Sequence, residues 1–298
     1  MSKAGQGKVD IGKLGIWTWL ESYSYQECVT FAHEVEEKGY STLWLPEAFG
    51  RDPFVILTLL ARETQNLKLA TGIANIYARD PMAMNAARNS LDEICDGRLI
   101  LGLGVSHSEI VSPVRQHEYG KPVATMRAYL EGMAQANYAA PVREPRSPLI
   151  LAALRDKMLG LAAEQADGAH PYFVTPEHTA KARDILGPDK ILAPEQKVLL
   201  VKDASEARPV ARRFMELYLS LKNYRNNLLT LGFNENDFEN GGSDRLVDAI
   251  VAWGDESTIQ KRIEEHWAMG ADHVCIQPLR PDGKPGFDEK AIEVFAPK

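Results

Sequence analysis

The stretch ATGIANIYARDPMAMNAARNSLDEICDGRLILGLGVSHSE, residues 70–109, decides the fold. It contains the end of an apolar strand (residues 67–73), a polar loop, a helix that Pro81 opens and a second apolar strand (residues 99–103). Two strands joined by a helical crossover run parallel, and α/β barrels place their functional groups at the carboxyl ends of such strands. We therefore expect the residues that follow these two strands to share one site.

The same alternation of strand and helix recurs along the chain. Apolar strands are expected at residues 14–19, 42–46, 67–73, 99–103, 148–153, 168–172, 197–201 and 273–277. Eight such units without a linker predict an α/β fold, a (β/α)8 TIM barrel that spans residues 1–298 as a single domain. A doubly wound sheet is the competing architecture, but LGIWTW in the first strand is followed by no glycine fingerprint.

Two insertion segments interrupt the alternation, one after strand four and one after strand seven. Residues 108–122 show no clear periodicity, which predicts an irregular loop acting as a lid over the site. Residues 206–231 read as one long helix, followed by an acidic, Asn-rich loop to Asp244. Further on, Ser257 and Gln260 fit a capping box at the start of the last long helix.

The composition excludes several classes of function. With 45% hydrophobic and 25% charged residues and a net charge of -7, the chain is typical of a soluble protein and unsuited to binding nucleic acid. No apolar run is long enough to span a membrane and no secretory signal is visible, so we expect a cytoplasmic protein. The sequence has no metal-binding motif, and Cys28, Cys95 and Cys275 are expected to be buried thiols.

Several segments occur in the order and spacing of a known family. They are LWLPE (residues 43–47), the stretch quoted above, PLILAAL (148–154) with KMLGLAAEQADGAHPYFVTPEHT (157–179), and MGADHVCIQP (269–278). Together they resemble the luciferase-like monooxygenase superfamily, and within it the actinobacterial oxidoreductases that use the deazaflavin coenzyme F420. The resemblance implies a homodimeric barrel that transfers a hydride between F420 and a small organic substrate. An FMN-dependent monooxygenase and a non-catalytic flavin- or deazaflavin-binding relative are the alternatives.

The resemblance also assigns cofactor-binding roles. It implies a bulge with a non-prolyl cis peptide at Gly72-Ile73 behind the ring, with Asn75 bonding to the ring or its side chain. Two further groups are implied, Val105 and Ser106 against the ring, and Leu154, Arg155, Lys157 and Met158 around the phosphate at a helix start. The family commonly has Gly-Pro where this chain has Arg155-Asp156, which adds a carboxylate beside the anion site.

Proton transfer is expected to involve His107 and, second, Glu47. The sugar-phosphate dehydrogenases of this group carry a His after the acidic residue that ends strand two, whereas Ala48 follows Glu47 here, and the glutamate that they carry after strand four falls at His107. Activity on glucose 6-phosphate is therefore not expected. A histidine suits proton transfer near neutral pH. Two structural alternatives remain open, a loop role for His107 and an ion pair between Glu47 and Arg51 or Arg79.

Other residues that attract notice have structural interpretations. Trp17 and Trp19 are expected to fill the barrel, although one of them could line the substrate pocket. His170 and His178 are expected to be structural and not a metal pair. The helical face formed by Phe214, Leu217, Tyr218 and Leu221 is expected to be core, with a dimer contact as the alternative.

Overall fold

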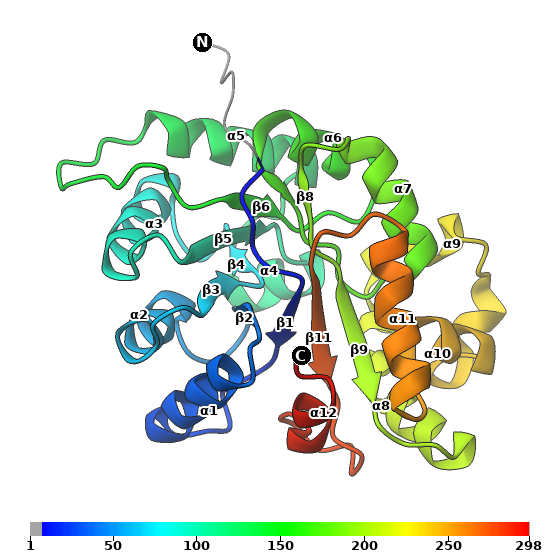
Figure 1. Cartoon of the computed structure of the whole chain (residues 1–298). Helices are drawn as coiled ribbons and strands as arrows, with labels where there is room; N and C mark the ends of the chain where they lie inside the picture. The colour runs from blue at the N-terminus through cyan, green and yellow to red at the C-terminus, as the bar shows by residue number, and fades with distance from the viewer. Residues whose placement is uncertain (1–7, 298) are drawn as a thin grey trace.

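The computed structural model describes residues 8–297, in which short parallel strands are surrounded by helices (Figure 1). The strands are β1 (Leu14–Trp17), β2 (Thr42–Leu45), β3 (Lys68–Thr71), β4 (Ala74–Asn75), β5 (Leu99–Gly104), β6 (Leu149–Leu151), β7 (Gly168–Ala169), β8 (Ile191–Leu192), β9 (Glu195–Leu199), β10 (Val251–Trp253) and β11 (Val274–Pro278). The helices are α1 (Tyr25–Glu37), α2 (Pro53–Glu63), α3 (Pro81–Ile94), α4 (Ser108–Arg115), α5 (Pro122–Gln135), α6 (Asp156–Gln165), α7 (Pro176–Leu186), α8 (Ala204–Ser220), α9 (Lys222–Thr230), the 3-10 helix η1 (Glu235–Gly241), α10 (Asp244–Ile250), α11 (Glu256–Ala268) and α12 (Glu289–Val294).

The strands close into a ring of eight. Strands β8 and β9 are two parts of one barrel strand, of which β8 pairs with β7 and β9 pairs with β11, while β11 pairs with β1. Across the break between β8 and β9, the Glu195 amide donates to the Pro171 carbonyl at 2.9 Å and the Cys275 amide to the Pro194 carbonyl at 3.0 Å. The predicted (β/α)8 barrel is confirmed, although its seventh strand begins at Ile191, earlier than expected.

Proline and a capping side chain start several helices where the sequence predicts it. Pro53, Pro81 and Pro176 stand in the first turns of α2, α3 and α7, each after a residue whose side chain accepts a backbone N–H. The capping box expected at Ser257 and Gln260 is wrong. Asp255, two residues before Ser257, caps α11 instead and accepts from the amide of Thr258, because its carboxylate satisfies the free amides equally well.

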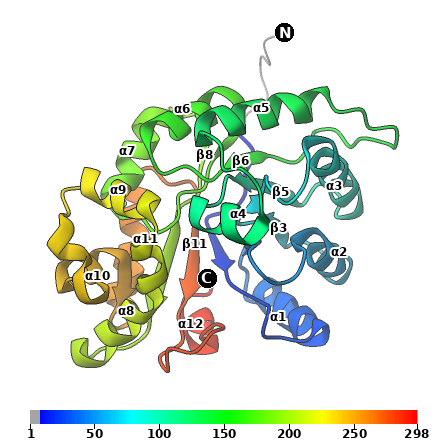
Figure 2. The ribbon, with the colours of Figure 1, turned by 180° about the vertical axis from the view of Figure 1, so that it is seen from behind.

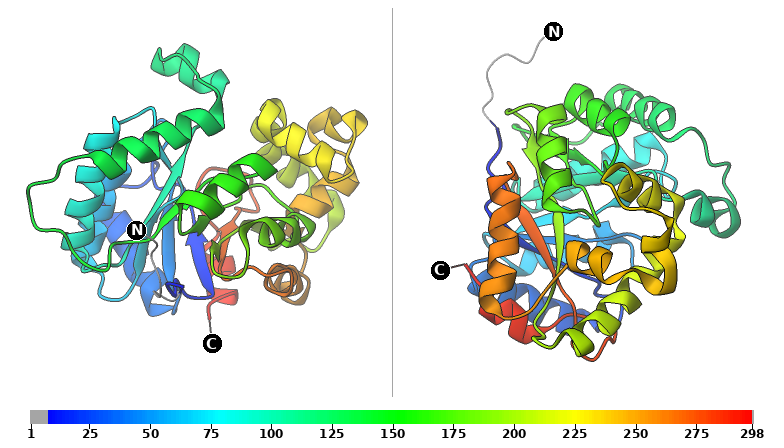
Figure 3. Two further views of the ribbon diagram at one scale, coloured as in Figure 1. Left: turned by 90° about the horizontal axis from the view of Figure 1, so that it is seen from above. Right: turned by 90° about the vertical axis from the view of Figure 1, so that its right-hand side faces the viewer.

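Both insertion segments carry more helix than predicted. After β5, α4 replaces much of the expected loop, and Figure 2 shows it lying in front of the barrel. After β9, the expected single helix breaks at Leu221, whose backbone is extended, into α8 and α9. η1 and α10 replace part of the acidic loop and β10 adds a strand to β9, while Figure 3 shows the α8–α10 segment grouped beside the barrel.

The barrel interior is filled by aromatic and branched side chains. Trp44 is fully buried there, and its indole N–H donates to Nε2 of His273 at 3.1 Å. The three cysteines are free and buried, as predicted. None of the helices in residues 8–297 has the length and apolar character needed to cross a bilayer.

Candidate active site

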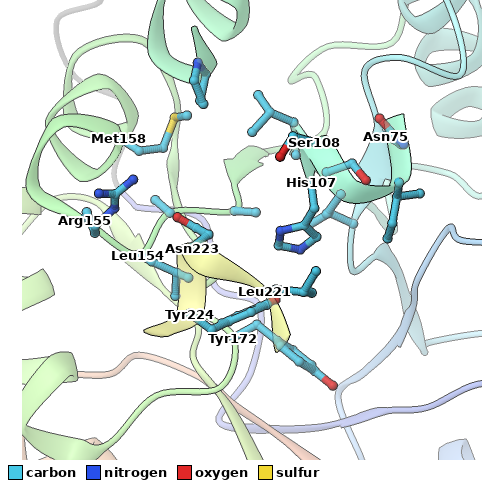
Figure 4. A pocket seen from close by; sticks show the side chains of 18 of the residues that line it. Asn75, His107, Ser108, Leu154, Arg155, Met158, Tyr172, Leu221, Asn223 and Tyr224 are labelled. Atoms are coloured by element: carbon cyan, nitrogen blue, oxygen red, sulfur yellow. The ribbon is translucent and has the colours of Figure 1, made fainter. Parts of the chain in front are cut away.

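A cavity of about 1180 Å³ opens at the carboxyl ends of the barrel strands (Figure 4). The residues that follow five strands line it: Glu47 after β2, Gly72 and Ile73 after β3, Ser106 and His107 after β5, Leu154 and Arg155 after β6, and His170 and Tyr172 after β7. Helices α8 and α9 complete the wall. Chain segments far apart in sequence therefore meet where barrel enzymes place their chemistry.

The first side of the cavity is formed by backbone and small residues of β3, β4 and β5. The peptide bond between Gly72 and Ile73 is cis, as the family resemblance implies. The Trp17 indole N–H donates to the Gly72 carbonyl at 2.8 Å. A Cβ at Gly104 would lie 2.5 Å from Cδ1 of Ile73, so the Ile73 side chain packs directly over the backbone of β5.

Glu47 lines this side but its carboxylate is already engaged. It accepts from Arg79 at 2.8 Å and from the backbone amide of Asn75 at 2.8 Å, and its side chain is 8% exposed. Arg79 also pairs with Asp52. Of the two ion pairs considered for Glu47, the structure contains the one with Arg79, and this arrangement suits positioning of Asn75 better than proton transfer.

Unlike the carboxylate of Glu47, the ring of His107 is half-buried and does not cap a helix. It is the N-cap residue of α4 by its backbone, while its side chain makes no capping bond. The ring lies 5.3 Å from the ring of Tyr224, and Figure 4 shows both projecting into the cavity. Burial lowers the pKa of His107, an effect that the carboxylate of Glu109 opposes. At neutral pH the imidazole is therefore uncharged and able to accept a proton.

The start of α6 forms the opposite rim, where Figure 4 shows Leu154, Arg155 and Met158 across the cavity from Asn75. No side chain caps this helix, so its first amides are free of a side-chain acceptor. Asp156 forms a 2.7 Å ion pair with Lys181, which lowers the pKa of the carboxyl group. The extra carboxylate predicted beside the anion site is therefore offset by a neighbouring cation.

The cavity is basic although the protein is acidic. Seven basic side chains line it, against three acidic ones: Arg115, Lys121, Arg127, Arg155, Lys157, Lys181 and Lys222, against Glu47, Glu109 and Asp156. The whole chain carries a net charge of -7. This local excess of positive charge favours an anionic ligand.

Aromatic side chains form the remaining wall, and the sequence interpretation missed it. The Tyr172 hydroxyl donates to Oε1 of Gln277 at 2.8 Å. The hydroxyl oxygen of Tyr218 lies 2.7 Å from that of Tyr172. The ring of Tyr224 lies 5.4 Å from that of Tyr218. The helical face expected to be core thus lines the cavity through Leu217, Tyr218 and Leu221. Helical spacing alone does not distinguish a core face from a cavity wall.

A buried ion pair lies behind this wall. Lys197 and Glu195, two residues apart on β9, are each 1% exposed, and their Nζ and Oε2 atoms are 3.1 Å apart. The Lys197 Nζ also lies 3.9 Å from the centre of the Tyr172 ring. Burial lowers the pKa of Lys197 and raises that of Glu195. In the sequence, the signal that could have indicated this ion pair is two charged residues, two positions apart, within an otherwise apolar strand.

His170 and His178 make the backbone contacts expected of structural residues. Nδ1 of His170 lies 2.7 Å from the Ala193 carbonyl, and Nε2 of His178 lies 2.6 Å from the Leu154 carbonyl. Within residues 8–297 no group of three or more His, Cys, Asp or Glu side chains is arranged to hold a metal ion. Trp17 and Trp19 both line the cavity, and Trp17 also packs in the barrel.

Comparison with known proteins gives a family and relatives of stated activity. The luciferase-like monooxygenase family model matches residues 13–273. A Mycobacterium tuberculosis protein named as a coenzyme F420-dependent oxidoreductase is 28% identical over 234 residues, 68% of this chain and 62% of that protein. The 5,10-methylenetetrahydromethanopterin reductase of Archaeoglobus fulgidus is 25% identical over 91% of this chain and 95% of that protein.

Among solved structures, an F420-dependent secondary alcohol dehydrogenase in complex with an F420-acetone adduct superimposes with a TM-score of 0.74. The match covers 95% of this chain and 97% of that one, at 14% identity. At this level of identity the likeness concerns the fold.

Proposed function

The chain belongs to the luciferase-like monooxygenase family, and from this premise we propose that it is an oxidoreductase that transfers a hydride between coenzyme F420 and a small organic substrate. Its relatives include F420-dependent oxidoreductases and reductases, which supports F420-linked redox activity. The observation that carries the proposal is the large, basic cavity at the carboxyl ends of the barrel strands.

The residues of the cavity fit such a cofactor. The uncapped start of α6, with Arg155 and Lys157 beside it, offers backbone N–H groups and positive charge to a phosphate. On the other side, Gly72, Ile73 and Asn75 would support the ring, and Val105 and Ser106 would lie along it. Leu154 and Met158 add apolar surface next to the helix start.

When bound, the deazaflavin supplies the carbon centre that gives or takes the hydride. The chain itself positions the cofactor and the substrate, excludes water from the cavity and moves a proton. Helices α4 and α9 cover the cavity, and His107 on the loop between β5 and α4 points into it. Because burial keeps His107 neutral near pH 7, its role is to accept a proton from the substrate in the oxidative direction and to return it in the reverse direction.

An FMN-dependent monooxygenase is the second candidate, because the family model itself describes luciferase-like monooxygenases. That activity would require reduced FMN and oxygen and would consume oxygen during turnover. The same basic rim would then hold the FMN phosphate, so the cofactor must be distinguished by measurement.

A titration panel tests the proposal. The purified protein is titrated with F420, FMN and NADPH, and binding is followed by cofactor fluorescence. We expect F420 to bind most tightly, and reduced F420 to be oxidised, without oxygen uptake, when a suitable substrate is supplied. Preferential FMN binding with oxygen consumption would establish the alternative, and binding of none of the three would remove both.

A further inference from the structure

The start of α6 is held by the neighbouring helix α7, which packs against it (Figure 1). Lys181 of α7 forms the ion pair with Asp156 that is described above. One turn earlier on α7, Nε2 of His178 lies 2.6 Å from the carbonyl oxygen of Leu154. The ion pair adjusts the charge at the rim, whereas the contact of His178 concerns the backbone itself and has no role in the proposed function.

The contact between His178 and Leu154 is a hydrogen bond of one defined direction. A carbonyl oxygen can only accept, so Nε2 of His178 carries the proton and donates it. The side chain is fully buried, and burial lowers the pKa of the imidazole, which is therefore neutral near pH 7. Its other nitrogen atom, Nδ1, then has a lone pair, and it has no hydrogen-bond partner among the described residues.

The unpaired Nδ1 atom makes His178 an unfavourable residue for a purely structural position. A buried acceptor without a partner loses its hydrogen bond to water and gains none in the protein. An apolar side chain of similar size would avoid this loss. What the histidine provides, and an apolar residue cannot, is the hydrogen bond that fixes the Leu154 carbonyl.

Fixing the Leu154 carbonyl also fixes the next backbone amide. The peptide bond between Leu154 and Arg155 is trans, and the C=O and N–H groups of a planar trans peptide point in opposite directions. The carbonyl points toward His178, which does not line the cavity, whereas Leu154 and Arg155 both line it (Figure 4). The Arg155 N–H therefore points away from α7, to the side on which the cavity lies, and it has no acceptor among the described residues.

This amide adds to the donors at the start of α6. Arg155 is the N-cap residue, and the amides of Asp156 and Lys157 follow it in the first turn without a capping side chain. Amides in such a position bind a phosphate together when they point at one place. A rotation of the peptide between Leu154 and Arg155 would present a carbonyl oxygen there instead of an N–H, and an oxygen atom repels an anion.

We propose that His178 is a positioning residue of the phosphate site, and that by holding the Leu154 carbonyl it directs the Arg155 N–H at the phosphate of the deazaflavin cofactor. This inference rests on the proposed function, because that function places the phosphate at the start of α6. His178 lies outside the cavity lining, so it acts through the backbone of Leu154 and Arg155. Its substitution should weaken binding of the phosphate group and leave binding of the ring unchanged.

Two ligands that differ in the phosphate alone test this assignment. They are the deazaflavin FO, which ends at its ribityl chain, and the phosphate ester of FO at the end of that chain; F420 is the third ligand. Fluorescence titration measures the three dissociation constants. His178→Leu should raise those of the phosphate ester and of F420 about tenfold and that of FO less than about twofold. His178→Gln should restore most of the lost affinity, because its amide N–H can donate to Leu154 from near the Nε2 position.

Thr179→Val is the matched control for stability. Thr179 is as deeply buried on α7 as His178, but its hydroxyl lies 2.8 Å from Nδ1 of His266 on α11 and not at the start of α6. Its loss should leave the ratio of the affinities for the phosphate ester and for FO as it is in wild type. Circular dichroism and thermal unfolding check that each variant folds.

The amide can also be observed in wild type, so the test holds even if His178→Leu does not fold. Protein made with isotope-labelled arginine gives an NMR resonance for the Arg155 amide, which is identified by its absence from Arg155→Lys. The phosphate ester should shift this resonance much further than FO does, since only the ester brings an anion to the N–H.

Several results would overturn this assignment. In His178→Leu they are an unchanged ratio of the affinities for the phosphate ester and for FO, or an equal loss for both, which would indicate a general structural role. An equal change of the ratio in Thr179→Val, no recovery in His178→Gln, or an Arg155 resonance that responds equally to both ligands would do the same. Failure of the proposed function is a separate outcome, because the wild-type protein would then bind none of the three deazaflavins.

Discussion

The two sides of the cavity differ in the groups that line them. The side formed by β3, β4 and β5 consists largely of backbone and small residues, and Gly72, Gly104 and Ser106 line the cavity there. The side formed by β7, α8 and α9 consists of large aromatic side chains supported from behind by a buried ion pair. Where backbone forms the wall, the shape is set by strand pairing; where side chains form it, the shape depends on packing at long range.

Because of this difference, we expect the two sides to respond differently to amino-acid substitutions. A backbone wall is sensitive to any added atom, because strands cannot move apart without losing their hydrogen bonds. A side-chain wall can change its lining and keep the fold, provided that its buried polar groups remain paired. The predictions below test each side at the point where it is expected to be most sensitive.

The largest effect is expected behind the aromatic side. Lys197→Met leaves the buried carboxylate of Glu195 without its partner, and we expect the free energy of unfolding to fall by about 3–5 kcal/mol. Urea denaturation followed by circular dichroism measures this change. The double variant Glu195→Gln/Lys197→Met removes both charges and should recover more than half of the loss. Equal instability of the single and double variants would show that packing, and not the charge, supports this wall.

The next effect concerns His107, which lies on the loop after β5 and contacts Tyr224 on the aromatic side. His107→Asn should lower kcat about 100-fold while F420 affinity stays nearly unchanged. In wild type the neutral imidazole is the active form for substrate oxidation. The rate should therefore be full above the His107 pKa and fall as pH decreases through it.

The pH profile has a direction that can be checked. Burial places the His107 pKa below its usual range, so the acid limb should have its midpoint below about pH 6.5. The Glu109 carboxylate raises this pKa, so Glu109→Gln should move the acid limb to still lower pH. An acid limb that persists unchanged in His107→Asn would assign proton transfer to another group.

A smaller effect is expected from one methyl group on the backbone side. A Cβ at Gly102 would lie 2.1 Å from the carbonyl oxygen of Thr71, a backbone atom that cannot move freely. Gly102→Ala should lower the free energy of unfolding by about 2 kcal/mol. Gly160→Ala is the control, because no atom lies within 4 Å of its Cβ and α6 should gain about 0.5–1 kcal/mol. Similar urea midpoints for the two variants would contradict the account of the backbone wall.

The same contrast explains what the sequence could predict. The barrel and the helix starts at Pro53, Pro81 and Pro176 follow from local signals, namely apolar periodicity, proline and capping residues. The bulge at Gly72-Ile73 followed from the family resemblance, and the structure contains the implied cis peptide there. Most of what was predicted for the site therefore lies on the backbone side.

The aromatic side could not be predicted, because it depends on contacts that no local pattern records. The break of the expected long helix at Leu221 occurs where α8 ends and α9 turns over the cavity. That Lys197 and Glu195 face each other inside the barrel requires knowing which face of β9 points inward. The orientation of β9 is set by its pairing with β11, in which Gln277 lies opposite Lys197 and Pro278 opposite Val198, 80 residues apart in the chain.

The smallest effect is expected at the start of α6, on the rim opposite the backbone side, where we propose that the cofactor phosphate binds. Asp156 stands in the first turn and pairs with Lys181 at 2.7 Å. Because the pair is exposed and already neutral overall, Asp156→Asn should tighten F420 binding less than about threefold. Lys181→Met leaves the carboxylate uncompensated beside the anion and should weaken binding more than Asp156→Asn strengthens it. Fluorescence titration at two salt concentrations measures both, since screening should shrink the Lys181→Met effect. A strong gain of affinity in Asp156→Asn would mean that Lys181 does not offset the carboxylate, and that the departure from Gly-Pro at residues 155–156 weakens the cofactor site.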